Sequence, residues 1–285
     1  RARRMIVYSL LMAWVFAVLG GLASMVAPDV AWTSPLARVL PGIIANDQYV
    51  QDLINPALAE VQTFYPDIRL NRPAAPYAYT NAWGSNIALL TPFVIAALHD
   101  RRLRIPAWIV GAGLAVGAIP FVIALNRGAW LTLAIGVVYG VVRYSLLNRR
   151  VVPIIAVVLL GLATVAVAFE VGLVDMAADQ LETRSGDSNE TRSNLYLDTV
   201  RTSAESPLIG YGTPRPNPSD QSGPPLGTHG QLWAVMFSHG YLAVVLYVGF
   251  FVLAFLRSRG RDPITHWAKV SLGIEIGRAS CRERV

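Results

Sequence analysis

The 285-residue chain has little charge and almost no cysteine. Charged residues make up 15% of it, whereas an average soluble domain carries roughly 25%. Cys281 is the only cysteine, so a disulfide framework is excluded. Hydrophobic residues reach 54% and the mean hydropathy is +0.45, which excludes a disordered or collagen-like chain. Because so few polar groups cannot coat a globule of this size, the composition predicts a membrane protein.

The short motifs of several enzyme classes are missing as well. There is no GxxxxGK[ST] phosphate-binding loop, so ATP-driven transport by this chain is not expected. No HExxH motif or His/Cys cluster indicates a metal site, and Asp175 and Asp179, one helical turn apart, fit a solvated helix face. A GxSxG nucleophile elbow is also absent. We therefore expect no bound metal, no cofactor and no covalent serine or cysteine intermediate.

Long apolar runs alternate with short arginine clusters along the chain. A bilayer crossing takes about 20 apolar residues. By that measure about six spans are predicted, at residues 6–27, 83–98, 105–125, 129–147, 151–174 and 232–256. Arg143 lies near the end of the fourth span, from where it can snorkel to the headgroups. We expect an all-α, polytopic membrane protein that forms a single helical domain over residues 1–275.

Both ends of the sequence indicate a fragment. Residues 276–285, IGRASCRERV, match the translation of a common sequencing adapter, and the chain opens with RARRM and no clear start. The last ten residues are therefore left out of the fold prediction. Without their three arginines and one glutamate, the formal net charge falls from +6 to +4.

The arginines also predict which side of the membrane each loop occupies. Residues 1–5, 99–104, 143–150 and 257–261 hold 12 arginines in 24 positions, whereas the other loops hold 8 in 114. Arginine-rich short loops stay on the cytoplasmic side, and every span then alternates in direction without a conflict. Two long loops, 28–82 and 175–230, are consequently expected outside, together with a short outer turn at 126–128.

Each long outer loop has its own predicted structure. In the first, apolar residues recur at helical spacing over 46–64, which fits an amphipathic helix on the membrane surface or packed on the spans, kinked at Pro56. In the second, residues 175–184 and 188–203 are helix-prone. The following segment, 213–228, has five prolines, which forbid regular structure. It is an irregular connector or a cover over a site.

Three arginines and one histidine on the predicted outer side could carry chemistry. Both outer loops are acidic overall, so a generic basic surface does not explain these arginines. Arg127, in LNRGAW, lies at the outer end of a span, where a guanidinium needs a partner, water or a lipid phosphate. Arg192 has acids nearby, and a surface ion pair is the plain alternative for it. Arg72 lies shortly before the second span. His229 directly precedes the sixth, where an interfacial aromatic-belt position is the alternative.

The order of these segments resembles a known family. NRGAWLTLAIG, at 126–136, resembles the Ser-Arg-Gly-Ala-Trp motif of the O-antigen ligase and Wzy-type polymerase superfamily. ESPLIGYGTPRP, at 205–216, resembles its Pro-x-x-Gly-x-Gly stretch, and His229 with Gly240 eleven residues later resembles its His-Asn element and final span. The resemblance covers about residues 70–256. Gly230 stands where that family commonly has asparagine, and His239 where it often has an acidic residue.

The resemblance implies a glycosyltransferase of the bacterial cytoplasmic (inner) membrane with an outward-facing site. Such ligases and polymerases transfer a glycan from a polyprenyl diphosphate carrier to a hydroxyl group on a lipid or glycan acceptor. His229 is then the catalytic base, and Arg127 and Arg192, with Arg72 as a lesser candidate, bind the diphosphate. Guanidinium forks suit that role in place of a metal ion. Direct attack inverts the anomeric centre. Besides the membrane lipids no other partner is implied, and nucleic acid is not expected.

Two other functional classes stay open. A non-enzymatic transporter or flippase of lipid-linked or anionic sugars would use the same arginines to hold phosphate, although the sequence shows no paired halves of the kind common in transporters. A structural membrane subunit would use them only to anchor its loops.

Overall fold

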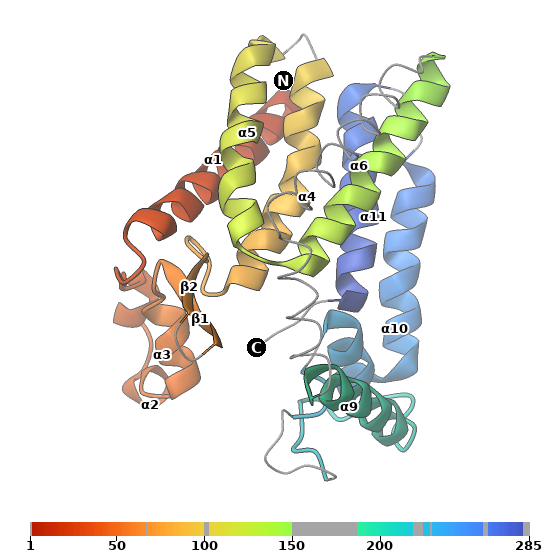
Figure 1. Cartoon of the computed structure of the whole chain (residues 1–285). Helices are drawn as coiled ribbons and strands as arrows, with labels where there is room; N and C mark the ends of the chain where they lie inside the picture. The colour runs from red at the N-terminus through yellow and green to blue at the C-terminus, as the bar shows by residue number, and fades with distance from the viewer. Residues whose placement is uncertain are drawn as a thin grey trace. The chain divides into compact units, whose positions relative to one another are not determined.

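We describe the fold from a computed structural model of the chain (Figure 1). The structure describes residues 2–65, 68–99, 103–149, 187–218, 225–228, 230–258 and 262–281. These parts are mostly helical and include one two-stranded sheet, which confirms the predicted all-α class apart from a small addition. They fall into two compact units, the first comprising Arg1–Gly136 with Arg259–Ile274, the second Val137–Ser258 with Glu275–Val285.

Four of the described helices are long and apolar enough to cross a membrane. They are α1 (Ala2–Val26), α4 (Thr80–His99), α6 (Arg127–Asn148) and α10 (Gln231–Arg257). Each coincides with a predicted span, and the predicted third span is the shorter apolar helix α5 (Ala107–Ile123). The predicted span at 151–174 lies outside the described residues.

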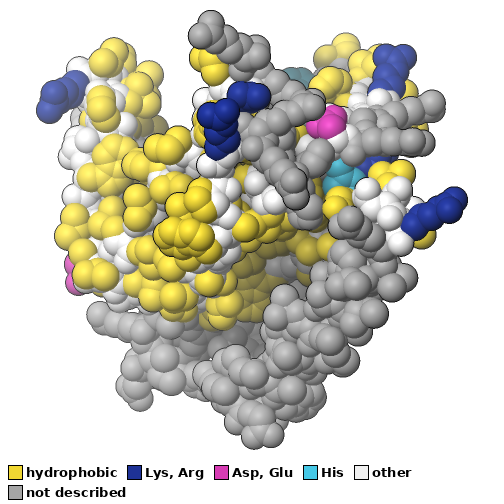
Figure 2. Space-filling model, turned by 90° about the horizontal axis from the view of Figure 1, so that it is seen from above, with side chains coloured by type: hydrophobic (Ala, Val, Ile, Leu, Met, Phe, Trp, Pro, Cys, Tyr) yellow, Lys and Arg dark blue, Asp and Glu magenta, His cyan; other side chains and the backbone are white. Residues whose placement is uncertain are grey.

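The surfaces of these helices are apolar, as contact with lipid requires. Phe16 on α1, Leu131 on α6 and Phe250 on α10 expose 63%, 61% and 65% of their surface. On the face seen in Figure 2, hydrophobic side chains cover most of the described surface, and charged side chains are few and separate. Soluble proteins rarely expose apolar surface of this extent. The side chains therefore agree with the polytopic membrane architecture.

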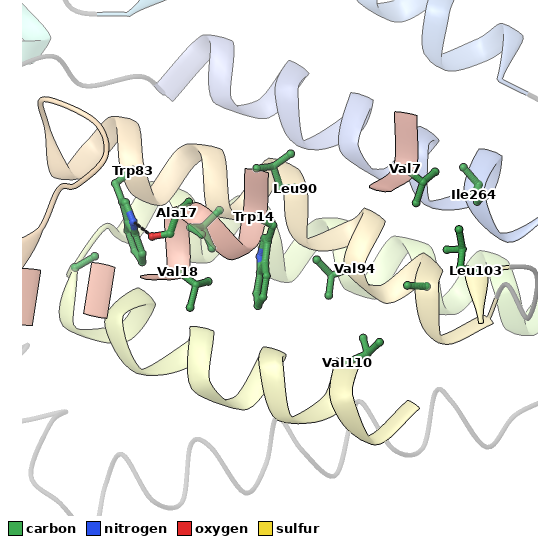
Figure 3. Packing of buried hydrophobic residues seen from close by; sticks show 13 residues of the cluster. Val7, Trp14, Ala17, Val18, Trp83, Leu90, Val94, Leu103, Val110 and Ile264 are labelled. Carbon is green, nitrogen blue, oxygen red and sulfur yellow. Dashed lines mark hydrogen bonds between the residues drawn. The ribbon is translucent and has the colours of Figure 1, made fainter. Parts of the chain in front are cut away.

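Two buried tryptophans hold the core of the first unit, where α1 packs against α4 and α5 (Figure 3). Trp83 of α4 is fully buried and donates its indole N–H to the Ala17 carbonyl of α1 at 2.8 Å. Trp14 of α1 donates in the same way to the Thr91 hydroxyl of α4 at 3.1 Å. Since both indoles are hydrogen-bonded, α1 and α4 are joined by polar as well as apolar contacts.

Replacing Trp83 by alanine is expected to lower the free energy of unfolding by about 3–5 kcal/mol, because a large cavity and an unpaired carbonyl are left behind. Trp108 on α5 is 74% exposed and provides the matched control, since its replacement by alanine leaves no cavity. Titration of the reconstituted protein with SDS measures both values. Equal losses for the two variants would contradict the described core.

The loop at 28–82, which was predicted to lie outside, differs from its predicted secondary structure. After η1 (Pro35–Arg38), α2 (Gly42–Ala45) and α3 (Gln48–Ile54), the chain forms strands β1 (Ala59–Tyr65) and β2 (Ile68–Pro73). The predicted amphipathic helix over 46–64 is therefore wrong beyond residue 54. Pro56 lacks an N–H and restricts the residue before it, and the β-branched and aromatic residues that follow favour a strand. The antiparallel pairing places Glu60 opposite Arg72.

One helix was not predicted from the sequence, and its residues up to Ile274 belong to the first unit. In α11 (Pro263–Cys281), Trp267 and Val270 are buried. Ser271 donates its hydroxyl to the Leu89 carbonyl of α4 at 3.0 Å. The helix thus packs on α4 through a stretch of chain that is too polar and too short in its apolar run to be predicted as a span.

The second unit is built from α9 (Asp187–Ser203), the loop that follows it, and α10. Leu195 of α9, Leu226 of the loop and Phe237 of α10 form its buried cluster. Tyr196 of α9 stacks on Trp233 of α10 with ring centroids 4.8 Å apart. These contacts hold the loop between the two helices.

The loop at 175–230, which was also predicted to lie outside, follows its predicted secondary structure where it is described. The helix-prone stretch 188–203 is α9, and the other such stretch, 175–184, lies outside the described residues. The described parts of the proline-rich segment form no helix or strand, and a single backbone bridge joins Arg215 to Leu226. This bridge brings the two ends of the proline-rich segment together.

Candidate functional site

Arg127 is the first residue of α6, directly after the turn that ends α5. Asn126 caps α6, because its side-chain oxygen accepts the Ala129 N–H at 3.0 Å. Leu125 bends the chain with a φ of 47°, a left-handed value that few non-glycine residues adopt. The Arg127 side chain is exposed, and no carboxylate of the described residues lies within 4.0 Å of its guanidinium. At the positive end of a helix, this cation is suited to bind an anion.

Arg72 of β2 is buried against the same turn. Its Nε–H donates to the Ala124 carbonyl, at the C-terminal end of α5, at 2.8 Å. One of its terminal nitrogens lies 3.7 Å from the Glu60 carboxylate of β1. Glu60 also accepts the Thr80 N–H at the start of α4 at 3.0 Å. The structure therefore brings Arg72 and Arg127 to one turn, Arg72 bonded to its backbone and Arg127 at its end.

The other two predicted site residues belong to the second unit. Arg192 lies in α9, three residues before Leu195 and seven before Thr199. His229 lies outside the described residues. The Gly227 N–H, two residues before it, contacts the Thr199 hydroxyl of α9 at 3.4 Å. The chain that leads to position 229 is thus attached to the helix that bears Arg192.

The PLIGYG segment locks into a break in α10. Gly240 interrupts the helix with a φ of 79° and a ψ of 177°. Three backbone hydrogen bonds bridge the break, from Tyr211 N–H to Phe237 O at 2.8 Å, from Gly212 N–H to Ser238 O at 2.9 Å, and from Tyr241 N–H to Pro207 O at 2.7 Å. The loop therefore supplies backbone hydrogen-bond partners that the broken helix cannot supply itself. This explains why a glycine pair in the loop and a glycine in the last span occur together in the sequence.

Replacing Gly240 by alanine is expected to release this lock. A Cβ there would lie 2.5 Å from the Pro207 carbonyl oxygen, and the backbone angles suit glycine alone. The backbone strain alone is expected to lower the free energy of unfolding by about 1–3 kcal/mol. Gly249 in the same helix is the matched control, because a Cβ there meets nothing within 4 Å and alanine favours a helix. We expect faster proteolysis of the 204–218 loop in the first variant only; equal rates in both would contradict the lock.

Arg215 is a cation of the second unit that the sequence analysis did not single out. Its guanidinium carbon lies 4.4 Å from the centroid of the Tyr211 ring, a cation–π contact. The Tyr211 hydroxyl donates to the Thr202 carbonyl at 3.0 Å and lies 3.2 Å from the Glu205 carboxylate. Partial burial raises the pKa of Tyr211, the bond to Glu205 and its charge raise it further, and Arg215 lowers it, so the phenol stays protonated. In the sequence, the arginine four residues after the tyrosine is the signal that could have indicated this cation–π contact.

The described residues of each unit include arginines that are suited to hold anions. Within them, no three His, Cys, Asp or Glu side chains gather as a metal site would require. Arg127 and Arg215 are both exposed, and Arg215 is held by its contact with the Tyr211 ring. Their guanidinium groups can offer paired N–H donors to phosphate oxygens.

A comparison with protein families identifies the chain. A family model described as O-antigen ligase matches residues 112–257, a segment that includes Arg127, Arg192, His229 and Gly240. No curated protein and no solved structure shows a significant match. Because the family model covers more than half of the 285 residues, and the motif order resembles the same family, the chain belongs to the O-antigen ligase family.

Proposed function

We propose that this protein transfers or polymerises a glycan from a polyprenyl diphosphate carrier onto a hydroxyl acceptor, on the outer face of the bacterial cytoplasmic membrane. Membership of the O-antigen ligase family supports a membrane glycan ligase or polymerase with lipid-linked glycan substrates. The lipid tail of such a donor requires an enzyme within the bilayer, and four apolar helices fit that need. No ATP is available on that face, so the energy of transfer is stored in the glycosyl diphosphate.

One observation carries the proposal beyond the family. Arg127 is exposed at the α5–α6 turn, without a carboxylate partner among the described residues, in the segment that matches the family. As the bond between sugar and phosphate breaks, negative charge builds on the diphosphate, and a fixed guanidinium stabilises it without a metal ion. Arg192 is the second diphosphate ligand in this proposal. Arg72, the lesser candidate from the sequence, is not assigned as a ligand, because its buried guanidinium already binds the Ala124 carbonyl and faces Glu60.

His229 is the proposed catalytic base. An acceptor hydroxyl attacks the anomeric carbon, the bond from that carbon to the diphosphate oxygen breaks, and the hydroxyl proton passes to the imidazole. A neutral imidazole near pH 7 suits this step. Because the hydroxyl attacks opposite the leaving diphosphate, the anomeric centre is inverted in a single step.

Transfer by the purified protein tests the proposal. The full chain in liposomes is incubated with a polyprenyl diphosphate glycan and a hydroxyl acceptor, and the products are separated by mass spectrometry. We expect free polyprenyl diphosphate and an equal amount of transferred or extended glycan of inverted configuration, in the presence of a metal chelator.

A different outcome would identify the alternative class. Movement of the intact donor between leaflets, with no release of free carrier diphosphate, would indicate a transporter or flippase and contradict the proposal. Loss of transfer after chelation would contradict its metal-independent part alone.

A further inference from the structure

We infer that Arg72 serves the proposed reaction as a positioning residue: it fixes the turn that carries Arg127, and it does not touch the diphosphate itself. This inference rests on the proposed function, in which Arg127 stabilises the leaving group. It also assigns a purpose to the outer hairpin of β1 and β2, which lies before the segment that matches the family.

Three hydrogen bonds from different elements fix the α5–α6 turn. Each comes from a separate part of the first unit: Arg72 Nε–H of β2 to Ala124 O at 2.8 Å, Asn126 Nδ2–H to Asn81 O of α4 at 3.3 Å, and Trp130 Nε1–H of α6 to Phe121 O of α5 at 2.9 Å. The left-handed backbone of Leu125 between these contacts is stable only where the surroundings determine it. The Arg72 bond is the shortest of the three and the only one from a charged donor, so its loss is expected to affect the turn most.

Arg72 is itself held in place from two sides. Glu60 lies opposite it in the hairpin register, 3.7 Å from its guanidinium, and Glu60 also accepts the Thr80 N–H of α4. The Thr80 hydroxyl donates in turn to the Arg72 carbonyl at 3.3 Å. The hairpin, the start of α4 and the end of α5 are thereby connected through one partly buried ion pair.

These contacts distinguish Arg72 from Arg127. The Arg72 side chain is 8% exposed, and its charge faces a carboxylate, whereas Arg127 is exposed without a described carboxylate nearby. Because the Arg72 guanidinium is buried against Glu60 and the Ala124 carbonyl, a diphosphate oxygen has little access to it. The guanidinium therefore contributes through the geometry of the turn, and a displacement of about 1 Å at Arg127 is enough to lower the rate roughly a hundredfold.

A double-mutant cycle separates the two roles. We expect Arg72→Ala to lower kcat about tenfold to a hundredfold, with a change in the donor KM of less than about threefold, because the turn misplaces Arg127 in the transition state. In an Arg127→Ala background the same change should alter kcat by less than about twofold, since nothing is left to position. If instead the fold-losses in kcat of the two substitutions multiplied in the double variant, the inference would be overturned, because Arg72 would then contact the substrate independently.

Two further variants guard against a general folding defect. Arg72→Gln keeps an N–H donor at this position but no charge, and it should retain more activity than Arg72→Ala if the bond to the turn is what matters. Arg38→Ala removes an exposed arginine from the same outer loop and should leave kcat unchanged. A glutamine variant as inactive as the alanine variant, although folded, would count against the inference.

A spin label at position 127 tests the inference without any turnover. The full chain carries Arg127→Cys in a Cys281→Ser background, which removes the chain's only other cysteine. Arg72→Ala should raise the mobility of the label, and Arg38→Ala should leave the spectrum unchanged. An unchanged spectrum in the Arg72 variant would overturn the positioning role. Absence of glycan transfer by the unaltered protein would instead overturn the proposed function, while leaving the effect on the spectrum in place.

Discussion

Replacing His229 by alanine is expected to lower the rate of glycan transfer by roughly 10²–10⁴-fold, the usual contribution of a general base. The physical reason is that the acceptor hydroxyl holds its proton tightly until attack is well advanced, and only a neutral imidazole at hand can take it. An unperturbed imidazole protonates at about pH 6.5. The rate of the unaltered protein should therefore fall at acid pH, where an imidazole is protonated, and the alanine variant should lose this dependence.

His239 gives the matched control for this experiment. It lies ten residues further along the chain, its side chain is exposed, and the adjacent Ser238 contributes its carbonyl to the α10 break. His239→Ala should keep the rate and the pH profile of the unaltered protein. Steady-state transfer measured between pH 5.5 and 8.5 compares the variants, and a fully active His229→Ala protein would refute its role as the base.

Replacing Arg127 by alanine is the second change with a large expected effect, a loss in kcat of roughly 10²–10³-fold. The guanidinium stabilises charge that develops on the leaving diphosphate, so its removal should affect kcat more than the donor KM. Arg127→Lys should recover part of the activity, because the charge is kept while the paired N–H donors are lost.

The control for Arg127 is an arginine whose charge is already paired. Arg201 of α9 lies 3.9 Å from the Asp198 carboxylate and is exposed. Surface pairs of this kind contribute little, so Arg201→Ala should change kcat by less than about twofold. The assignment of Arg127 fails if both variants lose activity equally, or if Arg127→Ala raises only KM.

Local sequence signals predict the spans. The segments that became α1, α4, α5, α6 and α10 are apolar over most of their length, and such runs need no knowledge of the rest of the fold. The Gly210 and Gly212 pair and Gly240 are also visible in the sequence. Their contact depends on the tertiary structure and not on local sequence, because the backbone hydrogen bonds join residues about 25–35 positions apart.

Contacts between residues that lie far apart in the sequence could not be predicted in the same way. Arg72 binds the carbonyl of a residue 52 positions away, and an isolated arginine before a span gives no sign of that. The β1 strand was predicted as a helix because its apolar residues fit both periods, and the pairing with β2 decided between them. For α11, Ser271 binds a carbonyl 182 positions away, so its place depends on the folded bundle.

The central claim is that outward-facing arginines and a histidine receive a lipid-borne diphosphate, and labelling from each face tests it most directly. Single cysteines at positions 127, 192 and 229, in a Cys281→Ser background, are treated with a membrane-impermeant maleimide in intact spheroplasts. A cysteine at Arg149, in a predicted cytoplasmic cluster, serves as the control. We predict labelling of the first three without permeabilisation and of position 149 only after it. Labelling of position 127, 192 or 229 from the cytoplasmic face alone would contradict the account.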